Sequence, residues 1–404
     1  MAITKVDPYT ANARGQRVLP SFSMAEHDRR FARVQRLMAE ARLDCLIVPP
    51  ADLWEIQSNS RYLTQVGGQQ GGAWAVVPAS GAETSILSSE REHKMWRPNL
   101  EWPVDMRWSN KPFDALVDRL KELSIERGRI GYAGLHTRPE GLIPFPIWEQ
   151  LNAQFPNASF IESTDVLDRC RVVKGDEEIA VVQRITDANE MAIEKMIEVA
   201  RPGLEESDVW LEMADVMMRA TGDYPARLAL GSNDGPSNAS NNMGLPIRME
   251  DGGILSQEID ARFQGYRAQC NHSILVGSKN ADTYREAMEA TIATFREMVA
   301  WVRPGHTVGE FLDEFQRVAE THGGIGESVT IHTNGLGFDR PRVGPGPFVK
   351  DADWQIEAGW TFTIKTHVKN KQSGRTALVG EPISVFETGA RRLGHRELRP
   401  VVTG

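Results

Sequence analysis

The chain has 404 residues, of which 41% are hydrophobic and 25% are charged, so it is long enough to bury the cores of two domains. Its formal net charge is −9, and no run of lysine and arginine is long enough to bind a phosphate backbone, which argues against a nucleic-acid partner. The three cysteines, Cys45, Cys170 and Cys270, stand far apart without a CxxC or CxxH pair. Neither a disulfide framework nor a thiolate zinc site is therefore indicated.

The beginning of the chain is polar, and no stretch of about 18 apolar residues occurs in it. We therefore expect a protein that makes no membrane contact. Since the cysteine usage fits a reducing compartment, we expect it to be cytoplasmic.

Helices and strands alternate in the first part of the chain. A capped amphipathic helix in "SMAEHDRRFARVQRLMAEAR" precedes a buried strand at Cys45–Val48. Strands are predicted around the turn in "GGAWAVVPASGAETSILSS" and in "GRIGYAG", and helices in "PFDALVDRLKEL" and "IPFPIWEQLNAQFP". This alternation predicts an α/β domain over residues 1–168.

A different pattern begins after residue 168. Residues 176–200 show apolar side chains at helical spacing and acidic residues in the first turn, which predicts one long helix. We therefore place the second domain at residues 169–404.

The second domain contains an internal repeat. The segments from Val199, "VARPGLEESDVWLEMADVMM", and from Trp301, "WVRPGHTVGEFLDEFQRVAE", each end one helix at Arg-Pro-Gly and begin another after a polar cap. Strand-like segments follow each half, "GGILSQEIDARFQGYRAQCNHSILVG" and "GWTFTIKTHVKNKQSGRTALVGEPISVFETG". A duplicated α-plus-β unit is predicted.

Five short motifs in this order resemble those of the creatinase and aminopeptidase ("pita-bread") superfamily, which includes the Xaa-Pro peptidases. They are "RVVKGDEEI" from Arg171, "GYRAQCNHSILVG" from Gly265, "HTNGLG" from His332, "IEAGWTFTI" from Ile356 and "GEPISVFETG" from Gly380. The resemblance covers nearly the whole chain. It implies a small N-terminal creatinase-like α/β domain and a C-terminal pita-bread α+β domain with an internal pseudo-two-fold repeat, and it implies a homodimer.

The resemblance also implies a metal site that this sequence has lost. Peptidases of this superfamily hold two metal ions with two aspartates, a histidine and two glutamates, because hard cations need anionic oxygens. The matching positions carry Glu258, Gln269, Leu336, Lys365 and Gly380. One carboxylate remains, and an ammonium group occupies a ligand position, where it would repel cations. We therefore expect no metal and no other cofactor.

Creatinase, a metal-free member, is the nearest precedent for catalysis. The position that corresponds to its acid/base histidine carries Ser237, and the region of its substrate-binding arginine carries Gln69 and Gln70. Creatine is therefore not expected as the substrate. Ser237 is a weak nucleophile candidate, since no neighbouring base is identifiable.

Alternation along the predicted strands brings a set of polar side chains to one pocket. On the strand from Gly359, Lys365 and His367 share a face about 7 Å apart. The predicted catalytic residues are Lys365, Glu258 and His332. The predicted substrate-binding residues are Gln269, Asn271, His367, Glu381, Arg340, Trp54 and Trp74.

Each of these residues also has a purely structural interpretation. Lys365 and Glu258 can be an ion pair that fills the former metal site. His332 can bond the backbone at a turn, and His367 can lie at the rim of the pocket. Arg340 and Arg342 can be solvated loop charges. His272 points to the opposite face and is expected to be a core residue.

Six of the ten tryptophans, among them Trp54, Trp74 and Trp108, lie in the first domain. One hypothesis is that some of them line the site and favour an aromatic or uncharged substrate; the other is that they are core residues.

Three functions stay open. The leading hypothesis is a metal-independent lyase that cleaves a small molecule by elimination or retro-aldol chemistry, which needs only a base, an acid and a cation near the developing oxyanion. The first alternative is a C–N hydrolase similar to creatinase or ectoine hydrolase. The second is a non-catalytic binding module of the pseudo-peptidase kind.

Overall fold

In the computed structural model, Pro8–Arg171 and Val172–Gly404 form two compact units. The boundary lies three residues beyond the one expected from the sequence. The residues described are 10–11, 17–18, 22–50, 59–66, 73–97, 100, 102, 104–133, 143–233, 243–337, 340–343 and 351–404. No helix among them is long and apolar enough to cross a membrane.

The first unit is built on a six-stranded sheet with the order β6-β5-β4-β3-β7-β8. Its strands are β3 (Cys45–Val48), β4 (Trp74–Pro78), β5 (Ser85–Ser88), β6 (Asp105–Trp108), β7 (Arg129–Tyr132) and β8 (Ser159–Glu162), with a separate pair, β1 (Thr10–Ala11) and β2 (Arg17–Val18). Its helices are α1 (Met24–Glu40), α2 (Asn59–Thr64), α3 (Glu90–Trp96), α4 (Pro112–Glu122), α5 (Phe145–Gln154) and α6 (Thr164–Arg171). Ser23 caps α1 by accepting a hydrogen bond from the Glu26 amide, so the predicted α/β domain with its capped first helix is confirmed.

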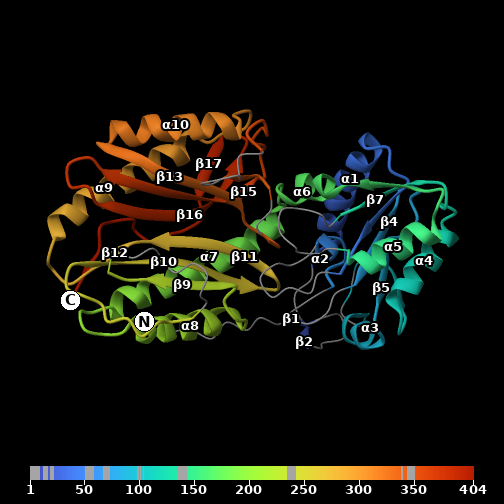
Figure 1. The fold of residues 1–404 in the computed structure, drawn as a ribbon, viewed down its shortest axis with the longest axis horizontal. Coiled ribbons are helices and arrows are strands. Elements are labelled where there is room, and N and C mark those ends of the chain that lie inside the picture. Colours follow the sequence, from blue (N-terminus) through green and yellow to red (C-terminus); the bar gives the residue numbers. More distant parts are fainter. Residues whose placement is uncertain are drawn as a thin grey trace. The chain divides into compact units, whose positions relative to one another are not determined.

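The second unit contains a sheet with the order β14-β13-β15-β16-β11-β10-β12-β18, to which β17 adds at β16 and β9 at β10 (Figure 1). Its strands are β9 (Arg227–Gly231), β10 (Gly253–Phe263), β11 (Tyr266–His272), β12 (Ile274–Val276), β13 (Gly324–Thr333), β14 (Arg342–Val343), β15 (Thr361–Asn370), β16 (Thr376–Phe386), β17 (Gly389–Arg392) and β18 (Val402–Thr403). Its helices are α7 (Asp176–Val199), α8 (Glu206–Thr221), α9 (Ala281–Trp301) and α10 (Val308–Thr321).

The two halves of this unit repeat one arrangement. Helices α7 and α8 pack together and against β9, β10 and β11, and α9 and α10 pack together and against β13, β15 and β16 (Figure 1). A capping box begins α8 at Glu205 and another begins α10 at Thr307. Each cap also forms an isolated β-bridge, Glu205 with Arg248 and Thr307 with Gln355. The predicted duplication is thus confirmed down to the two caps.

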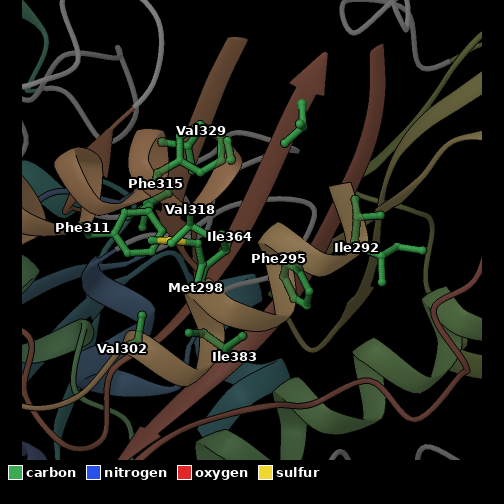
Figure 2. Packing of buried hydrophobic residues seen from close by; sticks show 14 of the residues in the cluster. Ile292, Phe295, Met298, Val302, Phe311, Phe315, Val318, Val329, Ile364 and Ile383 are labelled. Carbon is green, nitrogen blue, oxygen red and sulfur yellow. The ribbon is translucent and has the colours of Figure 1, made fainter. Parts of the chain in front are cut away.

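The core of the second half fixes which strand residues face the helices. Figure 2 shows Ile364 of β15 and Ile383 of β16 directed at the side chains of Phe295 and Met298 on α9. Because side chains alternate along a strand, Lys365 then points to the opposite face of the sheet. The apolar core therefore sets the direction of the polar residue that follows it.

We predict that Phe295→Ala lowers the free energy of unfolding by about 3–5 kcal/mol, because the truncated ring would leave a cavity between α9 and the sheet. Ile325→Ala, at a position 46% exposed on β13, is the control and should change it by no more than about 0.5 kcal/mol. Urea unfolding followed by tryptophan fluorescence measures both. Equal losses in the two variants would contradict the assigned core.

Candidate active site

Lys365 and Glu258 meet on the face of the sheet that points away from the helices. The ammonium nitrogen of Lys365 lies 3.4 Å from Glu258 Oε1, so β15 of the second half contacts β10 of the first half. Arg227 on β9 contacts the other oxygen of Glu258 at 2.9 Å. Strand register explains this contact, since Glu258 pairs with Ala229, two residues from Arg227. One carboxylate is thus shared by two cations.

The surroundings of this pair change its protonation chemistry. Burial lowers the pKa of Lys365, and the Glu258 carboxylate opposes that effect in part. Burial alone would raise the pKa of Glu258, but Lys365 and Arg227 beside it hold the pKa below its ordinary value. Burial, and then the Lys365 charge, lower the pKa of His367 to about 4, so this imidazole is neutral at neutral pH. Glu258, Arg227 and His367 are half-buried, so this end of the cluster reaches solvent.

A second ion pair lies beside the first on β10 and β11. Asp260 is fully buried and bonds Arg267, and the Lys365 charge acts on Asp260 as well. Burial raises the pKa of the Asp260 carboxyl, while Arg267 opposes the rise. Asp260 and Gln269 are cross-strand partners. Asp260 therefore lies between Glu258 and the polar group that contains Gln269.

Gln269 and His332 form the buried end of the cluster. His332 Nε2 lies 2.7 Å from Gln269 Oε1, although the two residues are 63 positions apart in the sequence. The hydroxyl of Thr363, two residues before Lys365 on β15, lies 3.1 Å from the Gln269 carbonyl oxygen and 2.9 Å from Asn334 Oδ1. Burial, and then the Lys365 charge, hold the pKa of His332 well below its usual range.

Asn271 on β11 and Gly380 on β16 lie where the strands of the two halves pair. They are cross-strand partners, and Gly380 is also the partner of Lys365. A Cβ atom at Gly380 would lie 2.5 Å from Asn271 Oδ1 and 2.7 Å from Lys365 Cγ. Only glycine fits there, because the lysine stem and the asparagine amide already fill the space.

These residues do not fit the two metal ions that the superfamily resemblance implies. Glu258 is already neutralised by two cations, Lys365 is itself a cation, and Gln269 Oε1 is taken by His332. The remaining two positions are the buried apolar Leu336 and Gly380, which has no room for a side chain. No group of three histidine, cysteine or acidic residues able to hold a metal occurs in the described part of the chain.

Glu381 was predicted to bind substrate, but the structure places it behind the sheet. Its carboxylate is fully buried and bonds Arg396, which also contacts His272 Nδ1 at 2.7 Å. The amides of His395 and Arg396 bond Glu190 of α7. The prediction is wrong because Glu381 directly follows Gly380 on β16. Since side chains alternate along a strand, Glu381 points to the face of the sheet that the helices cover. His272 is buried there too, as expected from its face.

The structure gives Arg340 and Trp74 other partners. Arg340 Nε donates to Asp351 Oδ1 at 2.8 Å, and its guanidinium lies over the Trp354 ring, so Arg340 is already bonded within its own loop region. Trp74 lies in the buried core of the first unit. Trp54, Ser237, Gln69 and Gln70 lie outside the described residues. Trp108 is half exposed at the edge strand β6.

Arg227 and Asn334 belong to the cluster without having been predicted from the sequence. Arg227 is the first residue of the short strand β9, and only the β9–β10 register reveals its approach to Glu258. Asn334 stands in the "HTNGLG" motif, where its amide could have been considered beside His332, but no spacing rule marks it. Both contacts depend on pairing between strands.

Comparison with known proteins agrees with this fold. Residues 30–173 match the creatinase/prolidase N-terminal domain, and residues 180–391 match metallopeptidase family M24. The Xaa-Pro dipeptidase of Pyrococcus furiosus is 22% identical over 91% of this chain and 98% of its own. The creatinase of a Bacillus species is 22% identical over 76% of this chain and 74% of its own.

Solved structures show the same fold. The prolidase of Pyrococcus horikoshii superposes with a TM-score of 0.73 at 18% identity, over 91% of this chain and 99% of its own. The family match covers more than half of the sequence, and it includes the strands that carry Glu258, Gln269 and Lys365. The chain therefore belongs to metallopeptidase family M24, in the creatinase/aminopeptidase superfamily with the pita-bread fold.

Proposed function

We propose that this protein is a hydrolase that cleaves a C–N bond in a small molecule without a metal ion, and that Lys365 and Glu258 carry the reaction. The observation that supports it most is the contact of 3.4 Å between the two, at positions where the superfamily's peptidases hold metal. The relatives named above are dipeptidases and a creatinase, whose names denote cleavage of C–N bonds.

The pair can supply both proton transfers that hydrolysis needs. The Glu258 carboxylate accepts a proton from water as the water oxygen bonds to the substrate carbon. The Lys365 ammonium, whose pKa is lowered by burial, donates a proton to the nitrogen as the C–N bond breaks. Lys365 and Glu258 then return to their starting states by passing one proton from the carboxyl group to the amine.

The sequence-based preference for a lyase is not supported by the relatives, and the hydrolase alternative fits them better. The binding-module alternative has no observation in its favour. A small-molecule substrate and a homodimer remain predictions, as does the cytoplasmic location.

Hydrolysis predicts that oxygen from water enters the product. The purified protein, treated with a strong chelator, is incubated in ¹⁸O water with glycyl-proline, ectoine, 2-pyrrolidone, methylurea, acetamidine and 2-phenoxyethanol. Mass spectrometry is expected to show one labelled oxygen in the product of a C–N substrate. Release of unlabelled fragments would indicate a lyase, and activity lost in chelator but restored by Mn²⁺ would contradict the proposal.

We predict that Lys365→Met and Glu258→Gln each lower kcat by about 10²–10⁴-fold on a substrate found in that panel, since each removes one proton transfer. The matched controls are Lys369→Met and Glu327→Gln, because these residues form an exposed ion pair, 3.8 Å apart, between β15, which also carries Lys365, and β13. The controls should retain full kcat. An unchanged kcat in Lys365→Met would show that the buried pair is only structural.

A further inference from the structure

Two buried side-chain amides in the cluster have free nitrogens. Gln269 and Asn334 are each 1% exposed. Their oxygens are used: Gln269 Oε1 contacts His332, and Asn334 Oδ1 accepts from Thr363 and lies 3.4 Å from the Gln269 backbone nitrogen. Gln269 Nε2 and Asn334 Nδ2 have no hydrogen-bond partner among the described residues. An unpaired buried donor costs about 1–3 kcal/mol, so two in one place need an explanation.

Both amides lie beside the Lys365–Glu258 pair. Thr363 bonds Asn334 and also contacts the Gln269 carbonyl oxygen, and Thr363 and Lys365 share a face of β15. Residues two apart on a strand are separated by about 7 Å. Thr363, which contacts both Gln269 and Asn334, therefore lies within the length of a small molecule from Lys365.

The state of His332 determines which end of Gln269 is free. Burial and the Lys365 charge keep His332 neutral, so its ring carries a single N–H. Nε2 lies 2.7 Å from Gln269 Oε1, whereas the contact of Nδ1 with the Thr333 oxygen is longer, at 3.4 Å. We assign the proton to Nε2 from this difference in distance, so that Nε2 donates to Gln269 Oε1 and the Gln269 NH₂ group is left for another partner.

We propose that Gln269 Nε2 and Asn334 Nδ2 together bind the carbonyl oxygen of the substrate, and that the substrate class is therefore amides, lactams or ureas. This inference rests on the proposed C–N hydrolase function. Two NH₂ donors complement a carbonyl oxygen, which only accepts hydrogen bonds. They cannot complement an amidinium or guanidinium group, which only donates.

The same two donors would assist the reaction. As water adds to the carbonyl carbon, the oxygen gains negative charge, and donors already in place stabilise it. Loss of one such donor typically lowers kcat about 10²–10³-fold. In this arrangement the amides hold the oxygen, while Glu258 and Lys365 move the protons.

The test compares two probes of one shape and opposite hydrogen-bonding character, acetamide and acetamidine. Saturation-transfer NMR on the full chain measures the dissociation constant of each. The wild type should bind acetamide more tightly. Asn334→Asp and Gln269→Glu each replace a donor by an acceptor, so each should shift the ratio of the two constants at least about 10-fold towards acetamidine, equivalent to about 1.4 kcal/mol.

Two further variants separate the proposal from a general effect on the fold. Asn152→Asp, on the exposed face of α5, should leave the ratio unchanged. Thr363→Val removes the hydroxyl that orients Asn334 without adding charge, so it keeps the test valid if a buried carboxylate prevents folding. Thr363→Val should weaken acetamide binding and leave acetamidine binding unchanged.

The proposal is overturned if neither probe binds, if the wild type prefers acetamidine, or if Thr363→Val and the folded charge variants leave the ratio unchanged. The NMR experiment measures binding and does not require turnover. Absence of hydrolysis would therefore contradict the proposed function but not the carbonyl-binding site. If the protein hydrolyses a C–N substrate but the variants leave the ratio of the two dissociation constants unchanged, the proposed carbonyl-binding site is wrong and the proposed function stands.

Discussion

The Lys365–Glu258 ion pair is the contact on which the arrangement of the candidate active site depends. It joins the two repeated halves of the second unit, since Glu258 belongs to the first and Lys365 to the second. The buried Lys365 cation and the half-buried Glu258 carboxylate each carry a desolvation cost, and removal of Glu258 would leave the buried ammonium without this partner. The neighbouring residues follow from this pair: Gly380 makes room for the lysine stem, and Arg227 completes the neutralisation of Glu258.

A second buried ion cluster behind the sheet supports the first. Arg396 bonds Glu381 and contacts His272, which directly follow the site residues Gly380 and Asn271. The Glu190 carboxylate on α7 holds the same C-terminal segment through its backbone amides. Ion pairs and hydrogen bonds therefore fix strands β11 and β16 on the face of the sheet that the helices cover, while the opposite face carries the candidate active site.

Much of this arrangement could be predicted from the sequence, because periodicity and local motifs determine it. Alternation along β15 predicts that Lys365 and His367 share a face, and the repeated Arg-Pro-Gly segments indicate two similar halves. The same rule turns Glu381 away from Lys365, because the strand partner of Lys365 is Gly380 and that of Ile364 is Glu381. Arg227 and Asn334 join the site through pairing between distant strands, which no local pattern encodes. The choice between hydrolase and lyase depends on substrate chemistry, to which the sequence pattern gives no access.

The superfamily resemblance implies a metal ligand at the position of Lys365. The proposal that the Lys365 ammonium takes the place of the metal is tested most directly by the metal content of the purified protein after dialysis against Mn²⁺, Co²⁺ and Zn²⁺ and removal of free ions, measured by inductively coupled plasma mass spectrometry. We predict that no divalent ion is retained in a stoichiometric amount, because the ammonium repels cations and Glu258 is already paired. Stoichiometric retention of an ion that is lost in Glu258→Gln would contradict it.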